Sequence, residues 1–259
     1  MSKGKKIVVV GDLQAKPDED FAHVRHIGQY IADKQPEIVV CIGDWWDFPS
    51  LSVYDKGKRS FEGRRLLADI EAGNRAMDIL FAPIVALQKR QKEAKKKVYN
   101  PRLVFTHGNH EERFDRLADN MPELDGFVGT ETLSLEKWGW EVYPFLQPVE
   151  IEGIFFVHYL ANPMTGKPYG GTALNQLKTV GRSFVVGHKQ VLDIALRPTL
   201  DGRLQVGVIN GATYPHDEAY KGYQGNAHFR GIVVLNEARD GFALPMPVTL
   251  DYLKDKYGN

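Results

Sequence analysis

Short, wholly apolar runs alternate with helical patterns through the first half of the chain. Residues 7–10, 38–42 and 103–105 are β-branched or otherwise apolar, which is typical of strands buried on both faces. Strands that alternate with helices favour a parallel sheet joined by right-handed crossovers. We therefore predict three parallel strands in this half.

Three helices are expected between and after these strands. Asp18 is a suitable N-cap for the first. Pro83 is expected to kink a long second helix over residues 64–97 or to split it in two. The third begins near Glu111. The first helix buries one face through residues at helical spacing, namely Phe21, Val24, Ile27 and Ile31.

The second half is richer in short strands separated by turn residues. One helix is expected there, around residues 172–180. These strands predict a second, mixed sheet that packs on the first, so the fold is α/β with two mixed β-sheets in a sandwich and helices on the outer faces, a four-layer αββα arrangement. A single domain would span residues 1–250, and residues 251–259 would form a polar tail. The predicted strands are 149–151, 154–158, 183–186, 191–195, 204–209, 232–235 and 243–248.

Polar residues gather where the predicted strands end. Asp12, Asp44 and Asn109 follow the first three strands, and His158 ends a later one. An Asp or Asn after a strand is often only a turn former. Convergence of several such segments instead indicates a site for divalent cations that activates water. The four segments are Gly-Asp-Leu-Gln at 11–14, Gly-Asp-Trp-Trp-Asp at 43–47, Gly-Asn-His-Glu at 108–111 and Gly-His-Lys-Gln at 187–190.

Composition adds limits on location and partners. The 33 basic and 33 acidic residues balance, which gives no support for a broad attraction to nucleic acids or membranes. The single cysteine, Cys41, lies in an apolar run and cannot form an internal disulfide, which fits a reducing, cytoplasmic location. Neither a signal peptide nor a membrane span is visible. The sequence identifies no protein partner.

The four segments and His158 resemble the motifs of the calcineurin-like metallophosphoesterase family, in the family's order, over residues 12–190. The family has Asp-x-His, Gly-Asp-x-x-Asp, Gly-Asn-His-Glu/Asp, an isolated His and Gly-His-x-His. Two positions depart from this pattern, since Gln14 and Gln190 stand where the family has histidines. The resemblance implies a metal-dependent phosphoesterase.

The resemblance also implies two divalent cations bridged by Asp44. Gln14 and Gln190 both fall on one of the two metal positions, and an amide oxygen is a harder, neutral donor than an imidazole. We therefore expect weaker binding there, with Mn²⁺ favoured and Mg²⁺, Fe²⁺ or Zn²⁺ as alternatives; an empty second position is the competing hypothesis. The other ligands would be Asn109, His158 and His188 at one position, and Asp12, Gln14 and Gln190 at the other.

Catalytic and substrate roles follow from the same resemblance. His110 would face the substrate and protonate the leaving oxygen, while Asp47 would fix its tautomer and favour its protonated form. Asn109 would contact the phosphate. Apart from the resemblance, Arg113 is close enough in sequence to bind a phosphate through two hydrogen bonds, and a surface salt bridge is the equal alternative. Tyr159 opens a long loop rich in Gly and Pro that is expected to contact the substrate.

The implied substrate is a phosphate ester, with phosphodiesters favoured over monoesters. A nuclease is one alternative, for which Trp45, Trp46 and the basic run at 89–97 are the supporting features. Both tryptophans are better interpreted as core packing residues. The basic run is better interpreted as a solvated helix end. A non-catalytic binding module of the same fold is a second alternative, supported by Gln14 and Gln190.

Overall fold

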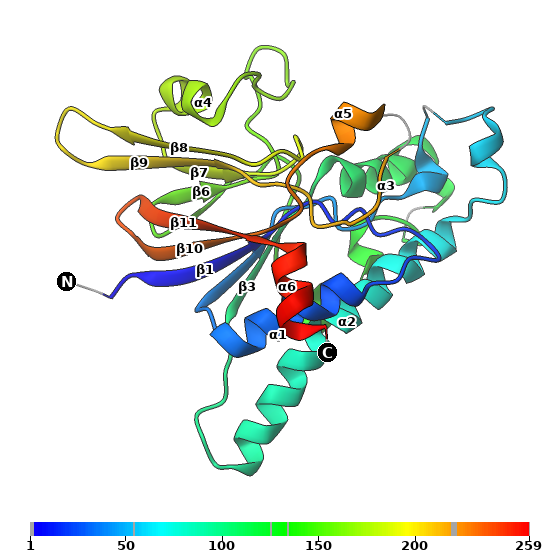
Figure 1. Cartoon of the computed structure of the whole chain (residues 1–259). Helices are drawn as coiled ribbons and strands as arrows, with labels where there is room; N and C mark the ends of the chain where they lie inside the picture. Colours follow the sequence, from blue (N-terminus) through cyan, green and yellow to red (C-terminus); the bar gives the residue numbers. More distant parts are fainter. Residues whose placement is uncertain (1–2, 54, 125, 134, 219–221, 259) are drawn as a thin grey trace.

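Two β-sheets pack face to face, with helices on both outer surfaces (Figure 1). The computed structural model describes residues 3–258 apart from 54, 125, 134 and 219–221. The predicted αββα sandwich is confirmed. The first sheet has, in spatial order, β11 (Phe242–Thr249), β10 (Gly231–Arg239), β1 (Lys5–Val10), β2 (Ile38–Cys41), β3 (Arg102–Thr106) and β4 (Glu141–Tyr143). The second has β5 (Val149–Ile151), β6 (Ile154–Phe156), β7 (Phe184–Val186), β9 (Leu204–Ile209) and β8 (Asp193–Pro198).

The central strand β1 is apolar throughout because both of its faces are covered. Val8 and Val10 pack into the core between the first sheet and its helices. Ile7 and Val9 pack into the core between the two sheets. Neighbouring side chains of a strand point to opposite faces, so an uninterrupted apolar run is required there. Cys41 at the end of β2 is likewise fully buried, as expected.

The placement of the last two strands differs from the prediction. Strands β1 to β3 run parallel, as expected, and β4, which was not predicted, extends them in parallel. Strand β10 instead pairs antiparallel with β1, and β11 pairs with β10. Both strands were predicted in the second sheet. The buried β1 would otherwise leave its backbone unpaired on one side, and the β10–β11 hairpin supplies those hydrogen bonds.

Helices cover the outer face of each sheet. Helix α1 starts later than predicted, and the carboxylate of Asp20, not Asp18, accepts the N–H of Ala22. Pro83 lies inside α2 without splitting it. The helices are α1 (Ala22–Lys34), α2 (Leu66–Glu93), α3 (Asn109–Asn120), α4 (Ala173–Val180), α5 (Gly222–Asn226) and α6 (Leu250–Tyr257), and the 3-10 helices are η1 (Pro49–Leu51), η2 (Arg59–Phe61), η3 (Pro122–Leu124), η4 (Thr130–Leu133) and η5 (Leu135–Trp138).

The end of the chain folds as helix α6, so the conformation expected for the polar tail is wrong. The side chain of Thr249 accepts the N–H of Tyr252 and caps the helix. Leu250 and Leu253 are buried in the helical core. The hydroxyl of Tyr257 donates to Asp33 of α1. Two apolar residues at helical spacing are enough to anchor this otherwise polar segment.

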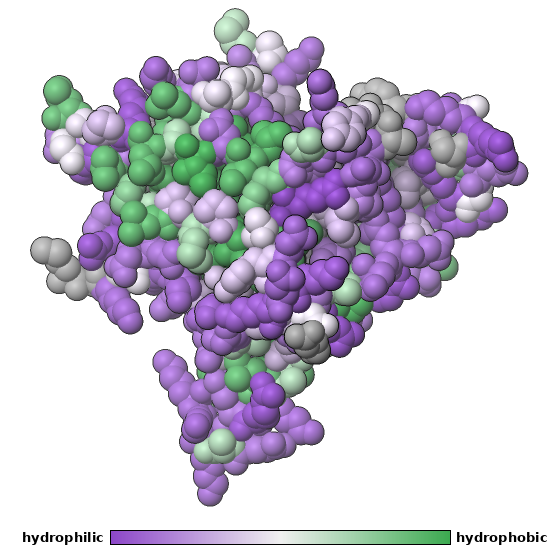
Figure 2. Space-filling view, viewed as in Figure 1, coloured by the Kyte–Doolittle hydropathy of each residue, from purple (hydrophilic) through white to green (hydrophobic). Residues whose placement is uncertain are grey.

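Apolar side chains also gather on the surface over β8, β9 and β11 (Figure 2). Strands β8 and β11 are the edge strands of their respective sheets. Leu196, Leu204, Leu244 and Met246 are all exposed there. No helix within the described residues has the length and apolar content that a bilayer span requires.

Candidate metal centre and active site

The predicted ligands meet where the strands of both sheets end. Asp12, Asp44 and Asn109 follow the parallel strands β1, β2 and β3 of the first sheet. His158 and His188 follow β6 and β7, which are parallel neighbours in the second sheet. Ends of parallel strands share one edge of a sheet, so the sandwich brings the two sets together.

One cluster of donor atoms has the geometry of a metal site. Single donor atoms of Asp44, His158 and His188 all lie within 4.8 Å of one another. The Oδ1 atom of Asn109 lies 3.0 Å from His158 Nε2 and 2.8 Å from His188 Nδ1. The carbonyl of Ile42 lies 2.8 Å from His158 Nδ1, which orients the ring and directs Nε2 into the cluster. Two imidazoles with two oxygen donors suit Mn²⁺, Fe²⁺ or Zn²⁺.

The buried carboxylates dominate the electrostatics of this cluster. Burial by itself would lower the pKa of His158, but the carboxylates of Asp44 and Asp12 outweigh it and raise the pKa to about 9. Burial and the neighbouring His158 lower the pKa of His188 to about 4. Burial opposes ionisation of Asp44, yet the adjacent His110 and His158 hold its pKa below the usual range. Asp44 is therefore an ionised carboxylate in the centre of the cluster.

The second predicted position centres on Asp12, which is fully buried. Its Oδ1 accepts the backbone N–H of His188 at 3.1 Å, and the side chain of Gln190 also hydrogen-bonds to it. Its Oδ2 has no hydrogen-bond partner among the described residues. Burial and the nearby charge of Asp44 raise the pKa of Asp12 to about 6. A buried carboxylate oxygen without a partner is what a bound cation would satisfy.

Four of the predicted ligands have left-handed backbone conformations. The φ angles are 49° at Gln14, 52° at Asp44, 65° at His188 and 57° at Gln190. This region costs an L-residue about 1–2 kcal/mol, and it persists only where the surrounding structure imposes it. The site therefore stores strain in the loops that present its donor atoms.

Glu111 is the site residue that the sequence analysis missed, although it belongs to the third motif. Its carboxylate is fully buried and accepts the N–H groups of Asp44 and Gly108 at 2.8 Å each. It also accepts those of Trp45 at 2.8 Å and Trp46 at 3.2 Å. Burial and the charge of Asp44 raise the pKa of Glu111, and the N–H groups of Gly108 and Asp44 oppose that shift.

His110 and Asp47 form the predicted pair at the edge of the cluster. The Nδ1 atom of His110 lies 3.1 Å from Asp47 Oδ1 and 2.7 Å from the carbonyl oxygen of Asp47. Its Nε2 lies 3.7 Å from Asp44 Oδ2. Burial alone would lower the pKa of His110, but Asp44 and Asp47 raise it to about 9. The imidazolium is therefore the favoured form at neutral pH.

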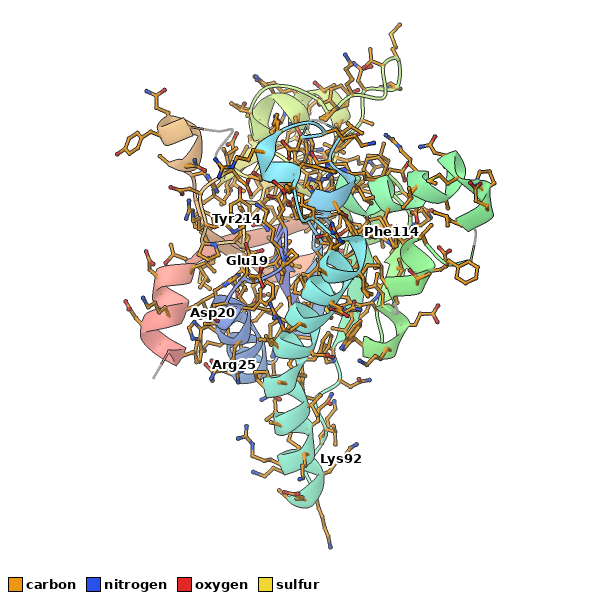
Figure 3. The ribbon with its side chains drawn as sticks, turned by 90° about the vertical axis from the view of Figure 1, so that its right-hand side faces the viewer. Glu19, Asp20, Arg25, Lys92, Phe114 and Tyr214 are labelled. Carbon is orange, nitrogen blue, oxygen red and sulfur yellow. The ribbon has the colours of Figure 1, made fainter. Side chains whose placement is uncertain are left out.

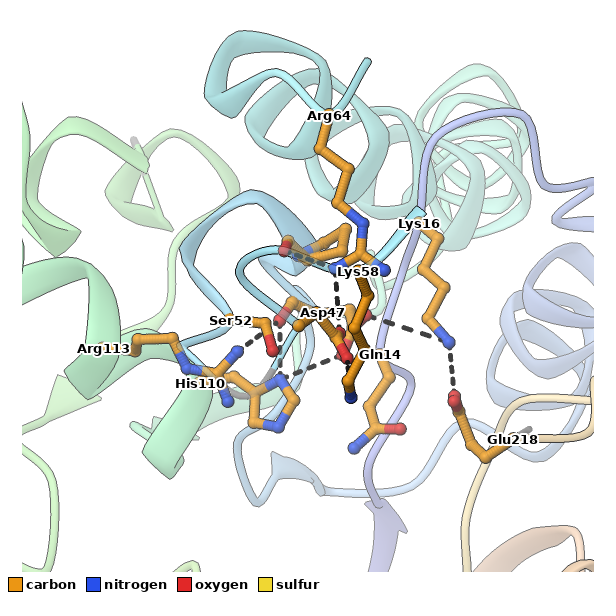
Figure 4. A pocket seen from close by; sticks show the side chains of 11 residues that line it. Gln14, Lys16, Asp47, Ser52, Lys58, Arg64, His110, Arg113 and Glu218 are labelled. Atoms are coloured by element: carbon orange, nitrogen blue, oxygen red, sulfur yellow. Dashed lines mark hydrogen bonds and ion pairs between the residues drawn. The ribbon is translucent and has the colours of Figure 1, made fainter. Parts of the chain in front are cut away.

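A cavity of about 690 Å³ opens beside His110 (Figure 4). Gln14 and Arg113 both line it, and Arg113 donates a long hydrogen bond of 3.4 Å to the carbonyl of Asp47. Tyr159 lies beside the metal cluster, with its ring centroid 4.9 Å from that of His188. The structure thus places Arg113 and Tyr159, two of the three predicted substrate contacts, near the predicted donor atoms.

Neither tryptophan of the second motif is available to stack on a base. Trp45 and Trp46 are buried, and their indole N–H groups donate to the carbonyls of Gly73 and Ile70. The predicted packing role is confirmed. The basic run at 89–97 lies at the projecting end of α2, where Figure 3 labels Lys92. The two tryptophans therefore carry no argument for a nuclease.

Comparison with known proteins decides the family. A sequence model of the calcineurin-like phosphoesterase family matches residues 5–231. The chain belongs to the calcineurin-like phosphoesterase family. It is similar to the gene 54 protein of Mycobacterium phage D29, with 30% identity over 189 residues that cover 71% of this chain and 68% of that protein. It is 28% identical to the gene 54 protein of Mycobacterium phage L5 over the same proportions.

We predict that Glu111→Gln destabilises this phosphoesterase by about 2–4 kcal/mol, because an amide nitrogen replaces an acceptor that faces buried N–H groups. Urea unfolding followed by circular dichroism measures the change. Glu112→Gln is the matched control: it removes only an exposed ion pair with Arg116 and should change stability by less than about 0.5 kcal/mol. Equal stability of the two variants would contradict the role assigned to Glu111.

Proposed function

We propose that this family member hydrolyses phosphodiesters with the help of divalent cations. The observation that carries the proposal is the His110–Asp47 pair directly beside the cluster of Asp44, His158 and His188. Bound cations would lower the pKa of a water molecule and neutralise charge on the phosphate. A cytoplasmic location is part of the proposal, supported by the single buried cysteine.

One group of residues would hold the cations, and another would move a proton. Asp44, Asn109, His158 and His188 would hold one cation, and Asp12 with the two glutamines would hold the other. Asp47 fixes His110 through Nδ1, so the Nε2 proton is the one available to the leaving oxygen. That transfer completes cleavage of the ester bond as oxygen from water adds to phosphorus.

The cavity beside His110 provides room for an organic leaving group of considerable size, as either a phosphodiester or a large monoester would carry, and the phosphodiester is the substrate proposed. The alternative is a non-catalytic binding module, supported by Gln14 and Gln190 at positions where the family has histidines. A binding module has no use for an imidazole that a carboxylate keeps protonated. The His110–Asp47 geometry therefore favours catalysis.

Hydrolysis should depend both on a bound metal and on His110. Metal-stripped protein should not hydrolyse bis-p-nitrophenyl phosphate, and Mn²⁺ should restore the reaction. His110→Ala should lower kcat by about 10²–10⁴-fold, as expected for loss of a general acid. Release of p-nitrophenol measures both effects, with p-nitrophenyl phosphate as the monoester comparison. Equal, background-level rates for wild type and His110→Ala with Mn²⁺, Mg²⁺, Fe²⁺ and Zn²⁺ would favour the binding module.

The two metal positions should differ in affinity. One Mn²⁺ should bind tightly and a second at least about tenfold more weakly, because amide oxygens replace imidazoles at Gln14 and Gln190. The double variant Gln14→His/Gln190→His should narrow this difference, most of all for Zn²⁺. Isothermal titration and native mass spectrometry measure affinity and stoichiometry. Gln91→His, at the far end of α2, is the control. Two equally tight Zn²⁺ sites in the wild type would refute the expectation.

The pH dependence of the reaction follows from the Asp47 contact. The charge of Asp47 helps to raise the pKa of His110. Asp47→Asn removes that charge, so His110 should lose its proton at lower pH, and the alkaline limb of kcat/KM should move to lower pH. Initial rates between pH 6 and 10 measure the limb. An unchanged alkaline limb would mean that His110 is not the acid.

A further inference from the structure

Basic side chains form one wall of the cavity that His110 also lines. Lys58 and Arg64 come from the segment between β2 and α2, and Lys16 comes from the loop after β1 (Figure 4). Segments that are distant in the sequence therefore place cations around one space. His110 forms part of the same lining, so this space continues directly from the reaction centre.

The carboxylate of Asp55 pairs with two of these cations. Asp55 Oδ1 lies 2.9 Å from Lys58 Nζ, and Asp55 Oδ2 lies 3.0 Å from Arg64. The paired contacts hold the pKa of Asp55 at about 2, so it carries a single negative charge against two positive ones. The side chain of Lys58 is 59% exposed, so its ammonium is accessible from the cavity. An excess of positive charge remains at this wall.

The other carboxylates of the lining are already engaged elsewhere. Glu218 pairs with Lys16. Asp47 binds His110 and lies 3.8 Å from Lys16. Neither is within ion-pair distance of Lys58 in the part of the chain that the structure describes. The uncompensated charge near Lys58 is therefore suited to an anionic group on a ligand.

The direction of the reaction decides which part of the substrate meets this wall. His110 delivers its proton to the leaving oxygen, so the leaving group lies on the His110 side of the phosphorus atom. That side is the cavity, and 690 Å³ is within the range of sites that enclose a small organic ligand. An anionic group beyond the leaving oxygen would reach the basic wall.

We propose that the cavity takes a leaving group that carries its own phosphate, bound by Lys58 and Arg64. This inference rests on the proposed phosphodiesterase activity and names its substrate class. The chemistry is that of a phosphodiester with a further phosphate on the departing nucleoside or alcohol. Both a nucleic acid strand and a small bisphosphorylated ester have it. Hydrolysis breaks the bond between phosphorus and the leaving oxygen, water supplies the new oxygen, and the second phosphate is unchanged.

The test compares three dinucleotides that differ only in a terminal phosphate: TpT, pTpT and TpTp. Chromatography of the products shows which internal ester bond breaks and therefore which nucleoside departs. A terminal phosphate on the departing nucleoside should raise kcat/KM for that bond at least about tenfold, the size expected of charge-assisted contacts. A terminal phosphate on the other nucleoside is the internal control and should have a much smaller effect.

Variants assign the effect to the basic wall. Lys58→Ala should remove most of the preference for the phosphorylated leaving group. Asp55→Asn should increase it, because the two cations then have no carboxylate between them. Lys137→Ala, which changes a lysine paired with Asp78 on the surface near η5, should leave the preference unaltered. A wild-type enzyme without the preference, or a preference that both Lys58→Ala and Asp55→Asn leave intact, would overturn the proposal.

Failure of this inference is distinguishable from failure of the proposed function. Hydrolysis of bis-p-nitrophenyl phosphate without any preference among the dinucleotides rejects the inference alone. If no ester is hydrolysed, calorimetric binding of thymidine 3′,5′-bisphosphate against thymidine 5′-monophosphate tests the same wall without turnover, and equal affinities reject it. A tetranucleotide that reacts faster than the phosphorylated dinucleotide identifies a strand as the source, and equal rates identify a small ester; both support the shared chemistry.

Discussion

Four backbone N–H groups from two loops converge on the buried carboxylate of Glu111. Three belong to the loop after β2 and one to the loop after β3, so this contact fixes the separation between Asp44 and Asn109. Close approach of the loops requires glycine. A side chain at Gly43, where φ is +86°, would lie 2.3 Å from the nitrogen of Gly108. The geometry of the metal centre therefore depends on an anion that does not itself bind the metal.

The same arrangement concentrates negative charge where water is excluded. Asp12, Asp44 and Glu111 are each at most 2% exposed. Burying three carboxylates is costly unless donors or cations compensate them. The N–H groups compensate Glu111, and imidazoles compensate Asp44, but one oxygen of Asp12 has no partner among the residues described. The fold thus leaves part of the negative charge of Asp12 without a compensating donor, at the point where a divalent cation would be most stabilising.

Sequence patterns predicted the sandwich and the gathering of polar residues at strand ends because both follow from local rules, whereas the assignment of metal ligands came from the family resemblance. Apolar runs define buried strands, and polar residues directly after them must lie at one edge of a sheet. Residues that act through tertiary contacts were harder to find. Strand β10 pairs with β1 across more than 200 intervening residues, and β11 joins the sheet through β10. Lys58 lies before the predicted second helix and Arg64 at its predicted start, so nothing in the sequence placed them at the same cavity as His110.

Gln190 is better understood from its hydrogen bonds than from the histidine that the family has at this position. Gln190 hydrogen-bonds to Asp12 and accepts from the hydroxyl of Tyr214 at 2.8 Å. An amide offers both donors and an acceptor, whereas a neutral imidazole bound to a metal has only one nitrogen left to donate. Gln190 can therefore support Asp12 whether or not a cation is bound nearby. This property would let the second position release its metal without leaving the buried carboxylate unsupported, while the histidine-rich cluster around Asp44 keeps its own.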